Sequence, residues 1–337
     1  MSVSPKGELV WNNILAGGRQ NWYPKMAVSS QGTVLLAFGS QGMSSGSMFR
    51  CNTKSLRQKR DRLSYAYQVV IVRMDQKGVC HWGRVVGVPY GNPRMYPTDV
   101  ALDEKGNGYV IGTFGGQAFF DATTLKSPVG QTSLFLTKIS DKGSFVWAKQ
   151  LSSSYPVTLP TSLKLDKQGN MYVIANFDKE LQLGTLKITP RRKPGSNPVK
   201  FLRDVLVAKY DPTGKLLWHV QIGGNEIDSY SDAIVGPKGS LFVSGNVRGT
   251  AQLSSMTYTS KGDADGFVVR LAPKDGKVTW AAFSQGSGVE SIGGLSFDSK
   301  GSLYVESISL SQSTKHGHLT TPGLLGLRNT RFWILKP

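Results

Sequence analysis

A segment with a fixed internal pattern recurs five times along the chain and constrains its fold more than any other feature. Each copy contains an apolar stretch, a tight glycine turn and a second apolar stretch that carries a tryptophan; these are Trp11, Trp82, Trp147, Trp218 and Trp280. A second apolar–turn–apolar element follows each tryptophan, with turn glycines at Gly32, Gly106, Gly169, Gly239 and Gly301. Successive glycines are 74, 63, 70 and 62 residues apart, and the interval from Gly301 through the chain ends to Gly32 is 68. The repeat therefore closes on itself.

The pattern within each unit predicts four antiparallel strands, because apolar and polar residues alternate over short stretches. The D-x-x-G turns between them are typical of tight connections, since Asp bonds to its own backbone and Gly adopts positive φ. One unit is typified by strands at 98–103, 108–114, 132–140 and 144–150. Five such units in a ring form a β-propeller, which leaves only short edges. The sequence thus predicts an all-β, five-bladed propeller.

The predicted propeller is one domain, 1–337, and its last blade uses both chain ends. The C-terminal RFWILKP matches the third strand of other units, such as DVLVAKYD, whereas residues 7–13 match a fourth strand without its own third strand. We therefore expect these two strands to close the ring, and the five repeat tryptophans to lie in the core between blades. The predicted blades span 23–86, 96–150, 159–221, 229–283 and 291–337 with 7–13.

The repeats resemble a known family. The run GTAQLSSMTYTSKGDADGFVVRLAPKDGKVTW, preceded by IGGNEIDSYSDAIVGPKGSLFVSGNV, is similar to the bacterial β-propeller repeats called SBBP. Their pattern includes a D-x-x-G-N turn, Y-V-x-G and a D-x-F-V-x-K strand. The resemblance is close in the second to fourth units and covers about four fifths of the chain. It implies a propeller, often in a surface or secreted setting, and it implies no set of catalytic residues.

The connections between second and third strands are the long ones, at 40–64, 115–131, 178–202, 248–264 and 310–330. Connections of this length usually serve function. Segment 40–64 has a net charge of +5 and segment 178–202 one of +4, and all five together hold +12 of the net +18. A basic face of this kind attracts polyanions or acidic partners, although a merely solvated basic surface has the same composition. The candidate binding residues are Arg50, Lys54, Arg57, Lys59, Arg60, Arg62, Arg191, Arg192, Lys193 and Lys200.

Aromatic residues occur where the predicted inner strands begin: Trp22, Tyr23, Tyr96 and Tyr230. At the mouth of a central funnel they could stack on sugars or bases, and the alternative is that they wedge neighbouring blades together.

Catalytic and metal-binding patterns are sparse. The chain has no G-x-S-x-G, P-loop or H-E-x-x-H motif, and its H-x-H pair, His316 and His318, lacks a recognisable third ligand. Asp99, Asp232, Glu226 and Glu290 are the acidic residues nearest the predicted funnel, but the two aspartates recur with the repeat, so bonding to the local backbone explains them more simply. No cofactor and no metal site are expected. Cys51 and Cys80 could pair, be buried or stay free, and the repeat places them far apart.

These observations favour a non-enzymatic binding or scaffolding protein. Its partner would be a protein in a larger assembly or a polyanion, either nucleic acid or an acidic glycan. Two alternatives remain open at this stage: a structural component of a particle or ribonucleoprotein, and a carbohydrate-active enzyme, since five-bladed propellers include glycosidases. No signal peptide or membrane-spanning run is visible in the sequence, so the location of the protein stays open.

Overall fold

The described residues form β-strands joined by turns, with one short 3₁₀ helix, η1 (Pro237–Gly239). The computed structural model describes residues 2–3, 6, 8–12, 15–16, 20–41, 49–51, 54–56, 67–87, 95–152, 157–192, 202–310, 313–316, 319–322 and 329–335. In this part of the chain no helix has the length and apolar character needed to cross a membrane. The predicted all-β class is confirmed. The chain forms two compact units, unit 1 (Met1–Tyr155 with Leu181–Lys187) and unit 2 (Pro156–Glu180 with Ile188–Pro337).

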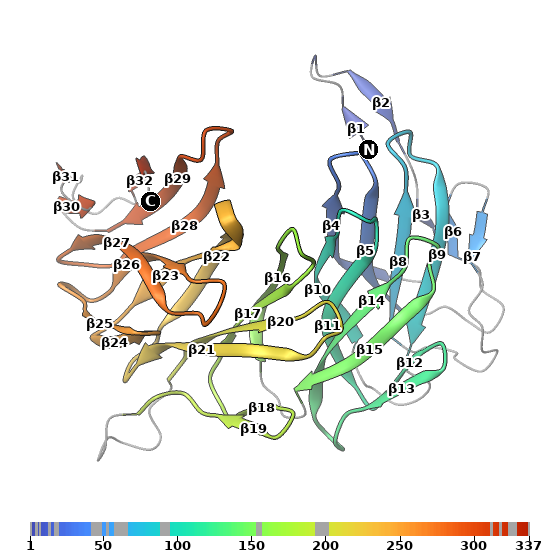
Figure 1. Cartoon of the computed structure of the whole chain (residues 1–337), viewed down its shortest axis with the longest axis horizontal. Coiled ribbons are helices and arrows are strands. Elements are labelled where there is room, and N and C mark those ends of the chain that lie inside the picture. Colours follow the sequence, from blue (N-terminus) through green and yellow to red (C-terminus); the bar gives the residue numbers. More distant parts are fainter. Residues whose placement is uncertain are drawn as a thin grey trace. The chain divides into compact units, whose positions relative to one another are not determined.

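Unit 1 contains the first two repeats, and each is a four-stranded antiparallel sheet with its strands in chain order (Figure 1). The first sheet consists of β4 (Gln20–Val28), β5 (Val34–Gln41), β8 (Tyr67–Met74) and β9 (Cys80–Gly87). The second consists of β10 (Met95–Leu102), β11 (Gly108–Gly115), β14 (Thr132–Ile139) and β15 (Phe145–Ser152). The strand order predicted for one unit of the repeat is therefore present in both sheets.

Unit 2 contains the last three repeats, in the same strand order. Repeat 3 consists of β16 (Val157–Leu165), β17 (Met171–Phe177), β20 (Asp204–Tyr210) and β21 (Leu216–Gly224). Repeat 4 consists of β22 (Ser229–Val235), β23 (Leu241–Val247), β26 (Asp265–Leu271) and β27 (Val278–Gly286). Repeat 5 has three strands, β28 (Glu290–Phe297), β29 (Leu303–Ser309) and β32 (Asn329–Leu335). The C-terminal segment thus pairs with β29 as a third strand, as predicted.

Several of the tight turns follow from Asp-x-x-Gly sequences. In the turn after β10, the Asp103 carboxylate accepts hydrogen bonds from the backbone N–H of Lys105 (3.0 Å) and Asn107 (2.8 Å). Gly106 has φ +79°, a left-handed conformation that favours glycine. The first-to-second turns of the other repeats have the same backbone bond, for example from Gly169 N–H to the Asp166 carbonyl (2.9 Å). In each of the four sheets that contain four repeat strands, the first-to-second and third-to-fourth connections are therefore short and lie at one end.

At the other end, the connection between the second and third strands contains a two-stranded hairpin in every repeat, where the sequence predicts only a long loop. The hairpins are β6 (Phe49–Cys51) with β7 (Lys54–Leu56), β12 (Gln117–Phe120) with β13 (Thr123–Lys126), β18 (Leu181–Leu183) with β19 (Leu186–Ile188), β24 (Thr250–Leu253) with β25 (Met256–Thr259), and β30 (Ser313–His316) with β31 (Leu319–Pro322). Figure 1 shows β12 and β13 beyond the end of the second sheet.

Four of the five hairpins contact the fourth strand of the preceding repeat. Strand β24 pairs with β21 through Ile222 and Gly223, which lie four and five residues after Trp218. Strand β30 pairs with β27 from Ser284, which lies four residues after Trp280. In unit 1, β12 contacts β9 and β18 contacts β15. The hairpins thus extend the contact between one repeat and the next.

The N-terminal segment pairs with the hairpin of repeat 1, as the fourth strands β21 and β27 pair with the hairpin of the next repeat. It contains β1 (Ser2–Val3), β2 (Leu9–Trp11) and β3 (Leu15–Ala16). Strand β3 pairs with β6, the hairpin strand of repeat 1, through Leu15 and Ala16, which lie four and five residues after Trp11. Strand β2 pairs with β1, so the fifth sheet has three strands here and not the four that the sequence predicts.

The hydrophobic core fills the space between consecutive sheets. In unit 1, Leu35 and Val69 of repeat 1 pack with Val110 and Phe135 of repeat 2. In unit 2, one cluster joins repeats 3 and 4, and another joins repeats 4 and 5. Because the middle strands are covered on both faces, β11, β17 and β20 are buried along their whole length. The alternation expected from the sequence is therefore weakest in these strands.

The repeat tryptophans are half-buried, which corrects the expectation that they lie fully in the core. The indole N–H groups of three of them bond to a third-to-fourth turn of a neighbouring repeat. Trp82 donates to the Asp141 carbonyl (2.8 Å) and Trp218 donates to the Pro273 carbonyl (3.1 Å), each in the repeat after its own. Trp11 makes the same bond to the Gln76 carbonyl of repeat 1 (2.8 Å). The N-terminal tryptophan therefore has the relation to repeat 1 that Trp82 and Trp218 have to the repeat after their own.

Cys51 and Cys80 form a disulfide, with their Cα atoms 6.2 Å apart. The sequence places these residues far apart, and that prediction is wrong. Cys51 is the last residue of β6, in the hairpin that the sequence does not reveal, and Cys80 is the first residue of β9, which the hairpin strand β7 contacts. Both residues are buried in an apolar cluster with Val70 and Val72.

Candidate functional site

The predicted basic residues fall into three groups. Arg191 and Arg192 are described with their side chains, and they follow the hairpin β18–β19 of repeat 3. For Arg50 and Lys54 the structure gives the backbone alone, in β6 and β7. The others lie outside the described residues: Arg57, Lys59, Arg60, Arg62, Lys193 and Lys200.

Arg191 is held in place by backbone carbonyls. Its Nη1 donates to the carbonyl oxygens of Gln221 (3.0 Å), Gly223 (3.1 Å) and Gln252 (3.3 Å). These carbonyls come from β21 and from β24, the hairpin strand of repeat 4. The guanidinium therefore bridges two repeats, and burial lowers the pKa of Arg191, partly opposed by Asp204 and Asp228.

Two fully buried carboxylates lie close to Arg191. Asp204 Oδ2 accepts hydrogen bonds from the backbone N–H of Arg191 (3.0 Å) and from Gln221 Nε2. Asp228 accepts from the backbone N–H of Gly224 (2.7 Å) and of Arg248 (2.9 Å). Burial raises the pKa of Asp204 to about 7 and that of Asp228 to about 6, because a charged carboxylate is poorly solvated there.

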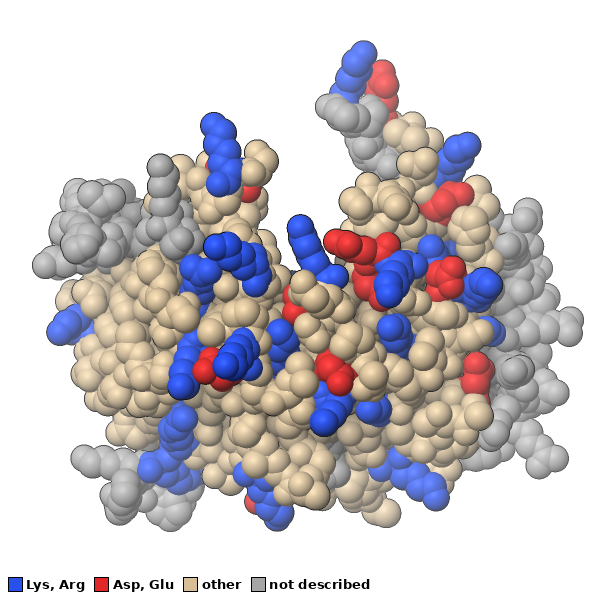
Figure 2. Space-filling view, in the orientation of Figure 1, with Lys and Arg blue, Asp and Glu red and all other residues tan. Residues whose placement is uncertain are grey.

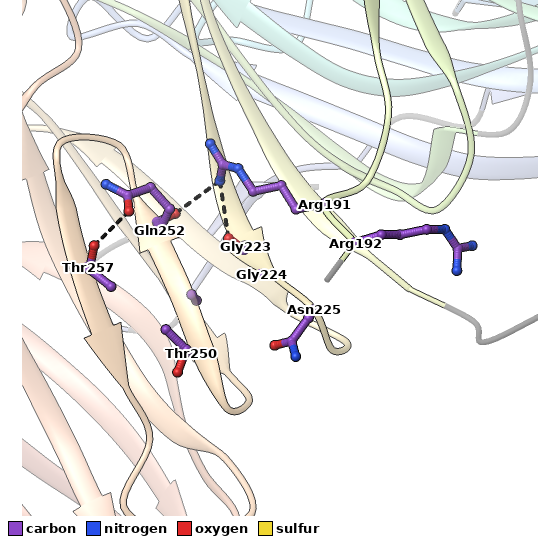
Figure 3. A pocket seen from close by; sticks show the side chains of 9 residues that line it. Arg191, Arg192, Gly223, Gly224, Asn225, Thr250, Gln252 and Thr257 are labelled. Carbon is purple, nitrogen blue, oxygen red and sulfur yellow. Dashed lines mark hydrogen bonds between the residues drawn. The ribbon is translucent and has the colours of Figure 1, made fainter. Parts of the chain in front are cut away.

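A pocket of about 400 Å³ opens beside these groups. It is lined by Arg191, Arg192, Gly223, Gly224, Asn225, Thr250, Ala251, Gln252 and Thr257. Figure 3 shows that Arg191 reaches toward Gly223 and Gln252, whereas Arg192 extends away from them. Gly224 is required for this geometry, since a Cβ atom there would lie 2.0 Å from the Thr250 carbonyl oxygen. The lining therefore offers a fixed cation, amides and hydroxyls.

Three of the four predicted funnel aromatics come together in unit 1. Trp22 stacks on Tyr67, with ring centroids 5.6 Å apart, and Tyr23 meets Tyr96 edge to face at 5.2 Å. Tyr67, which is not among the predicted funnel aromatics, also packs edge to face against Tyr96, with ring centroids 6.2 Å apart. Tyr23 is 55% exposed and has φ +51°, which is uncommon for a tyrosine. The cluster joins strands of repeats 1 and 2, as the wedge interpretation predicts.

Tyr230 does not belong to this cluster and is no surface aromatic. It is 7% exposed and packs in the core between repeats 3 and 4. Its backbone N–H donates to Asn176 Oδ1 (2.9 Å). The proposal that Tyr230 stacks on a ligand is therefore wrong, because neighbouring sheets cover its ring.

The acidic residues considered for catalysis have structural partners. Asp99 accepts from the backbone N–H of Val100 (2.9 Å), and Asp232 accepts from that of Ala233 (2.8 Å). Asp232 also accepts from Leu295 N–H in the next repeat (3.0 Å). Glu290 is fully buried, and its Oε1 accepts from the Ser309 hydroxyl (3.2 Å). Among the residues described with side chains, no group of three or more His, Cys, Asp or Glu has a metal-binding arrangement.

Part of the positive charge supports the fold. Lys209 is 5% exposed, lies 3.2 Å from Asp166 and donates to the Pro273 carbonyl (3.0 Å). Its ammonium also lies over the Tyr172 ring, 4.8 Å from the centroid. Figure 2 shows other Lys and Arg side chains dispersed over the face in view, with fewer Asp and Glu among them. Charge alone therefore does not mark the site, and the surroundings of each cation matter.

Comparisons with known proteins give little help with function. No protein family matches the sequence, and a comparison with curated proteins finds no match either. Among solved structures, a crystal structure of a protein of unknown function from Dyadobacter fermentans DSM 18053 is similar over 90% of this chain and 79% of that chain, with 13% identity and a TM-score of 0.40. The function is therefore argued from the residues of this chain.

Proposed function

We propose that the five repeats form a closed five-bladed β-propeller, in which the N-terminal strand β2 is the fourth strand of the fifth blade. Two relations support this. The Trp11 indole bonds to repeat 1 as the Trp82 indole bonds to repeat 2. Strand β3 pairs with the hairpin of repeat 1 four residues after Trp11, as β21 pairs with the hairpin of repeat 4 four residues after Trp218.

The exposure of β32 supports the same proposal. Phe332 is 78% exposed at its place in the three-stranded fifth sheet. The residues at the equivalent register positions of the other four sheets have no exposed area: Ile71, Leu136, Val207 and Val268. On β2, Leu9 is 62% and Val10 57% exposed. Pairing of β2 with β32 covers apolar groups of both strands, which stabilises closure by the hydrophobic effect.

The proposed propeller is a non-enzymatic binding or scaffolding protein that engages an acidic or polyanionic partner. The observation that carries this proposal is the concentration of positive charge in the hairpin-bearing connections, which hold +12 of the net +18 in 105 of 337 residues. In a closed ring these connections share one face, because the tight turns occupy the opposite end of every sheet. The described part of that face includes the Arg191 pocket.

The experiment is retention on a heparin column. Changing Arg57, Lys59, Arg60 and Arg62 to Glu should move elution to much lower salt, because phosphate- or sulfate-rich polymers bind basic surfaces largely through counterion release. The matched control changes Lys105, Lys142, Lys215 and Lys300 to Glu in the exposed tight turns, with the same loss of charge. Equal shifts for both variants would show a diffuse basic surface and overturn the proposal.

A further inference from the structure

The junction between repeats 3 and 4 departs from the repeat at the positions that form the pocket. Its framework also occurs between repeats 4 and 5. The backbone N–H of Arg191 donates to Asp204 Oδ2 (3.0 Å), and that of Lys261 donates to Asp265 Oδ2 (2.9 Å). Both aspartates are fully buried at the start of a third strand. Arg191 and Lys261 are therefore equivalent in the fold.

The side chains around the two aspartates differ. Beside Asp265, the Tyr258 hydroxyl contacts the carboxylate, and the Tyr258 ring stacks on Phe283 with centroids 3.8 Å apart. The residue equivalent to Phe283, three positions after the repeat tryptophan, is Gln221 in the other junction. An aromatic pair therefore lies at the junction of Asp265, whereas the Gln221 amide and the Arg191 guanidinium lie at the junction of Asp204.

The fold does not require a guanidinium at this place, because the neighbouring junction has the same backbone connections without one. The chain between the residue whose N–H bonds to the aspartate and the aspartate itself is also longer, 13 positions from Arg191 to Asp204 against 4 from Lys261 to Asp265. A half-buried charge in place of an aromatic pair carries a desolvation cost. Departures of this kind from a local pattern are expected at functional sites.

The pocket presents unused hydrogen-bonding groups. Arg191 Nη1 bonds to carbonyls, whereas its Nε and Nη2 make no hydrogen bond within the described residues. The Asn225 side chain, half-buried at the pocket, also makes none there. Thr250 and Thr257 add exposed hydroxyls; that of Thr250 bonds to the Thr259 hydroxyl (3.0 Å) and that of Thr257 donates to Gln252 Oε1 (2.7 Å), and each oxygen can still accept a further bond. The donors thus combine one cation for an anionic group with polar groups for hydroxyls.

We propose that this pocket binds an acidic sugar unit, with its carboxylate or sulfate at Arg191 and its hydroxyls at Asn225, Thr250 and Thr257. The inference rests on the proposed polyanion-binding function and specifies its ligand. We expect a nucleotide to bind more weakly than an acidic sugar. None of the residues that line the pocket is aromatic, so a base has no side-chain ring on which to stack. The volume of about 400 Å³ accommodates a ligand of small-molecule size.

The experiment is calorimetric titration of the full chain at physiological salt with four probes. They are a heparin-derived tetrasaccharide, a hyaluronan tetrasaccharide, neutral chitotetraose and the oligonucleotide dT8. We expect binding of at least one acidic tetrasaccharide and none of chitotetraose. The heparin fragment carries sulfate and carboxylate, whereas hyaluronan carries carboxylate alone, so the pair identifies the anionic group. Binding of neither acidic tetrasaccharide would overturn the inference, and heparin-column retention in the same preparation would leave the proposed function standing.

Three variants locate the binding. Arg191→Gln should weaken it about 10- to 100-fold, the usual effect of losing a hydrogen bond to a charged group. Lys261→Gln removes the same charge at the equivalent position and should change affinity less than about twofold. Asn225→Ala, which leaves the Arg191 contacts intact, should weaken binding several-fold and serves if Arg191→Gln fails to fold. Equal losses for Arg191→Gln and Lys261→Gln, or tighter Arg191-dependent binding of dT8, would overturn the proposal.

Discussion

The junction between repeats 3 and 4 and the junction between repeats 4 and 5 share the same backbone contacts but differ in their side chains. In the first, Arg203 forms a parallel bridge with Ile227, and in the second, Ala264 forms the same bridge with Val289. Asp228 N–H donates to the Arg203 carbonyl (2.8 Å), as Glu290 N–H donates to that of Ala264 (2.8 Å). The backbone contacts between the repeats are therefore the same at both junctions. The side chains differ, with a stacked aromatic pair at one junction and a polar pocket at the other.

The largest expected effect tests whether the N-terminal strand β2 pairs with the C-terminal strand β32 as the fourth strand of the fifth blade. By the register of the other sheets, Trp11 should lie opposite Ile334 and Asn12 opposite Trp333. The double variant Asn12→Cys, Trp333→Cys should therefore form a second disulfide and raise the free energy of unfolding by about 4 kcal/mol, because the closed loop is very long. Non-reducing mass spectrometry and urea unfolding measure the two effects.

The control for this cross-link shifts the register. Asn12→Cys with Arg331→Cys places the second cysteine two residues away along the same strand, so its disulfide should form slowly and stabilise less. If neither pair forms a disulfide, the N-terminal strand does not complete the fifth blade. The closed-ring proposal is then wrong.

The next effect is the pH dependence of stability that Asp204 causes at the junction between repeats 3 and 4. Asp204 titrates near pH 7 in the folded chain, whereas an unfolded aspartate titrates near 3.8. Between these values the folded chain keeps a proton that the unfolded chain has lost, so stability falls as pH rises. Asp204→Asn should remove that fall and make the variant more stable at pH 8 by on the order of 3 kcal/mol, since one pKa unit corresponds to about 1.4 kcal/mol.

Urea unfolding at pH 4, 6 and 8 measures this difference, with Asp275→Asn, at an exposed ion pair, as the control. The control should follow the wild-type pH profile. A pH profile of Asp204→Asn that runs parallel to the wild type would show that burial of Asp204 does not perturb its titration.

The smallest effect tests the aromatic junction. Tyr258→Phe removes the hydroxyl that contacts Asp265 and accepts from Gln285 Nε2 (2.7 Å), while it keeps the ring stacked on Phe283. A buried carboxylate then loses a donor, and we expect a loss of about 1 to 2 kcal/mol in the free energy of unfolding. Tyr304→Phe, at a ring that is 41% exposed, should change stability by less than about 0.5 kcal/mol. A tolerated Tyr258→Phe would mean that Asp265 is held by Lys261 N–H alone.

The local signals in the sequence were sufficient for the strands and turns. Asp103 and Gly106 predict their turn because one supplies a carboxylate for the backbone and the other a positive φ, both of which are local properties. The placement of β32 as a third strand follows from the apolar pattern shared with β20. The hairpins were missed because short polar strands such as β13 bury little and show no apolar alternation.

The candidate site could be predicted only in part. The sequence indicates Arg191 and Arg192 because they belong to a run of basic residues. Such a run shows where cations occur, but it does not show which side chain is held in place by hydrogen bonds. Arg191 gains its partners from Gln221 and Gln252, 30 and 61 residues away, and no local pattern reports such contacts. Likewise, Tyr230 has the same local setting as Tyr96, yet neighbouring sheets bury it.

The sequence by itself determined the five-fold repeat, the all-β class, the order of strands within each repeat and the tight turns, since these depend on periodicity and on residues a few positions apart. Tertiary structure alone decided the Cys51–Cys80 pair, the half-burial of the tryptophans and the pocket at Arg191. These depend on contacts between segments distant in the sequence, such as β6 with the start of β9 and β24 with β21. Contacts between distant segments follow from packing, and packing is a property of the whole fold.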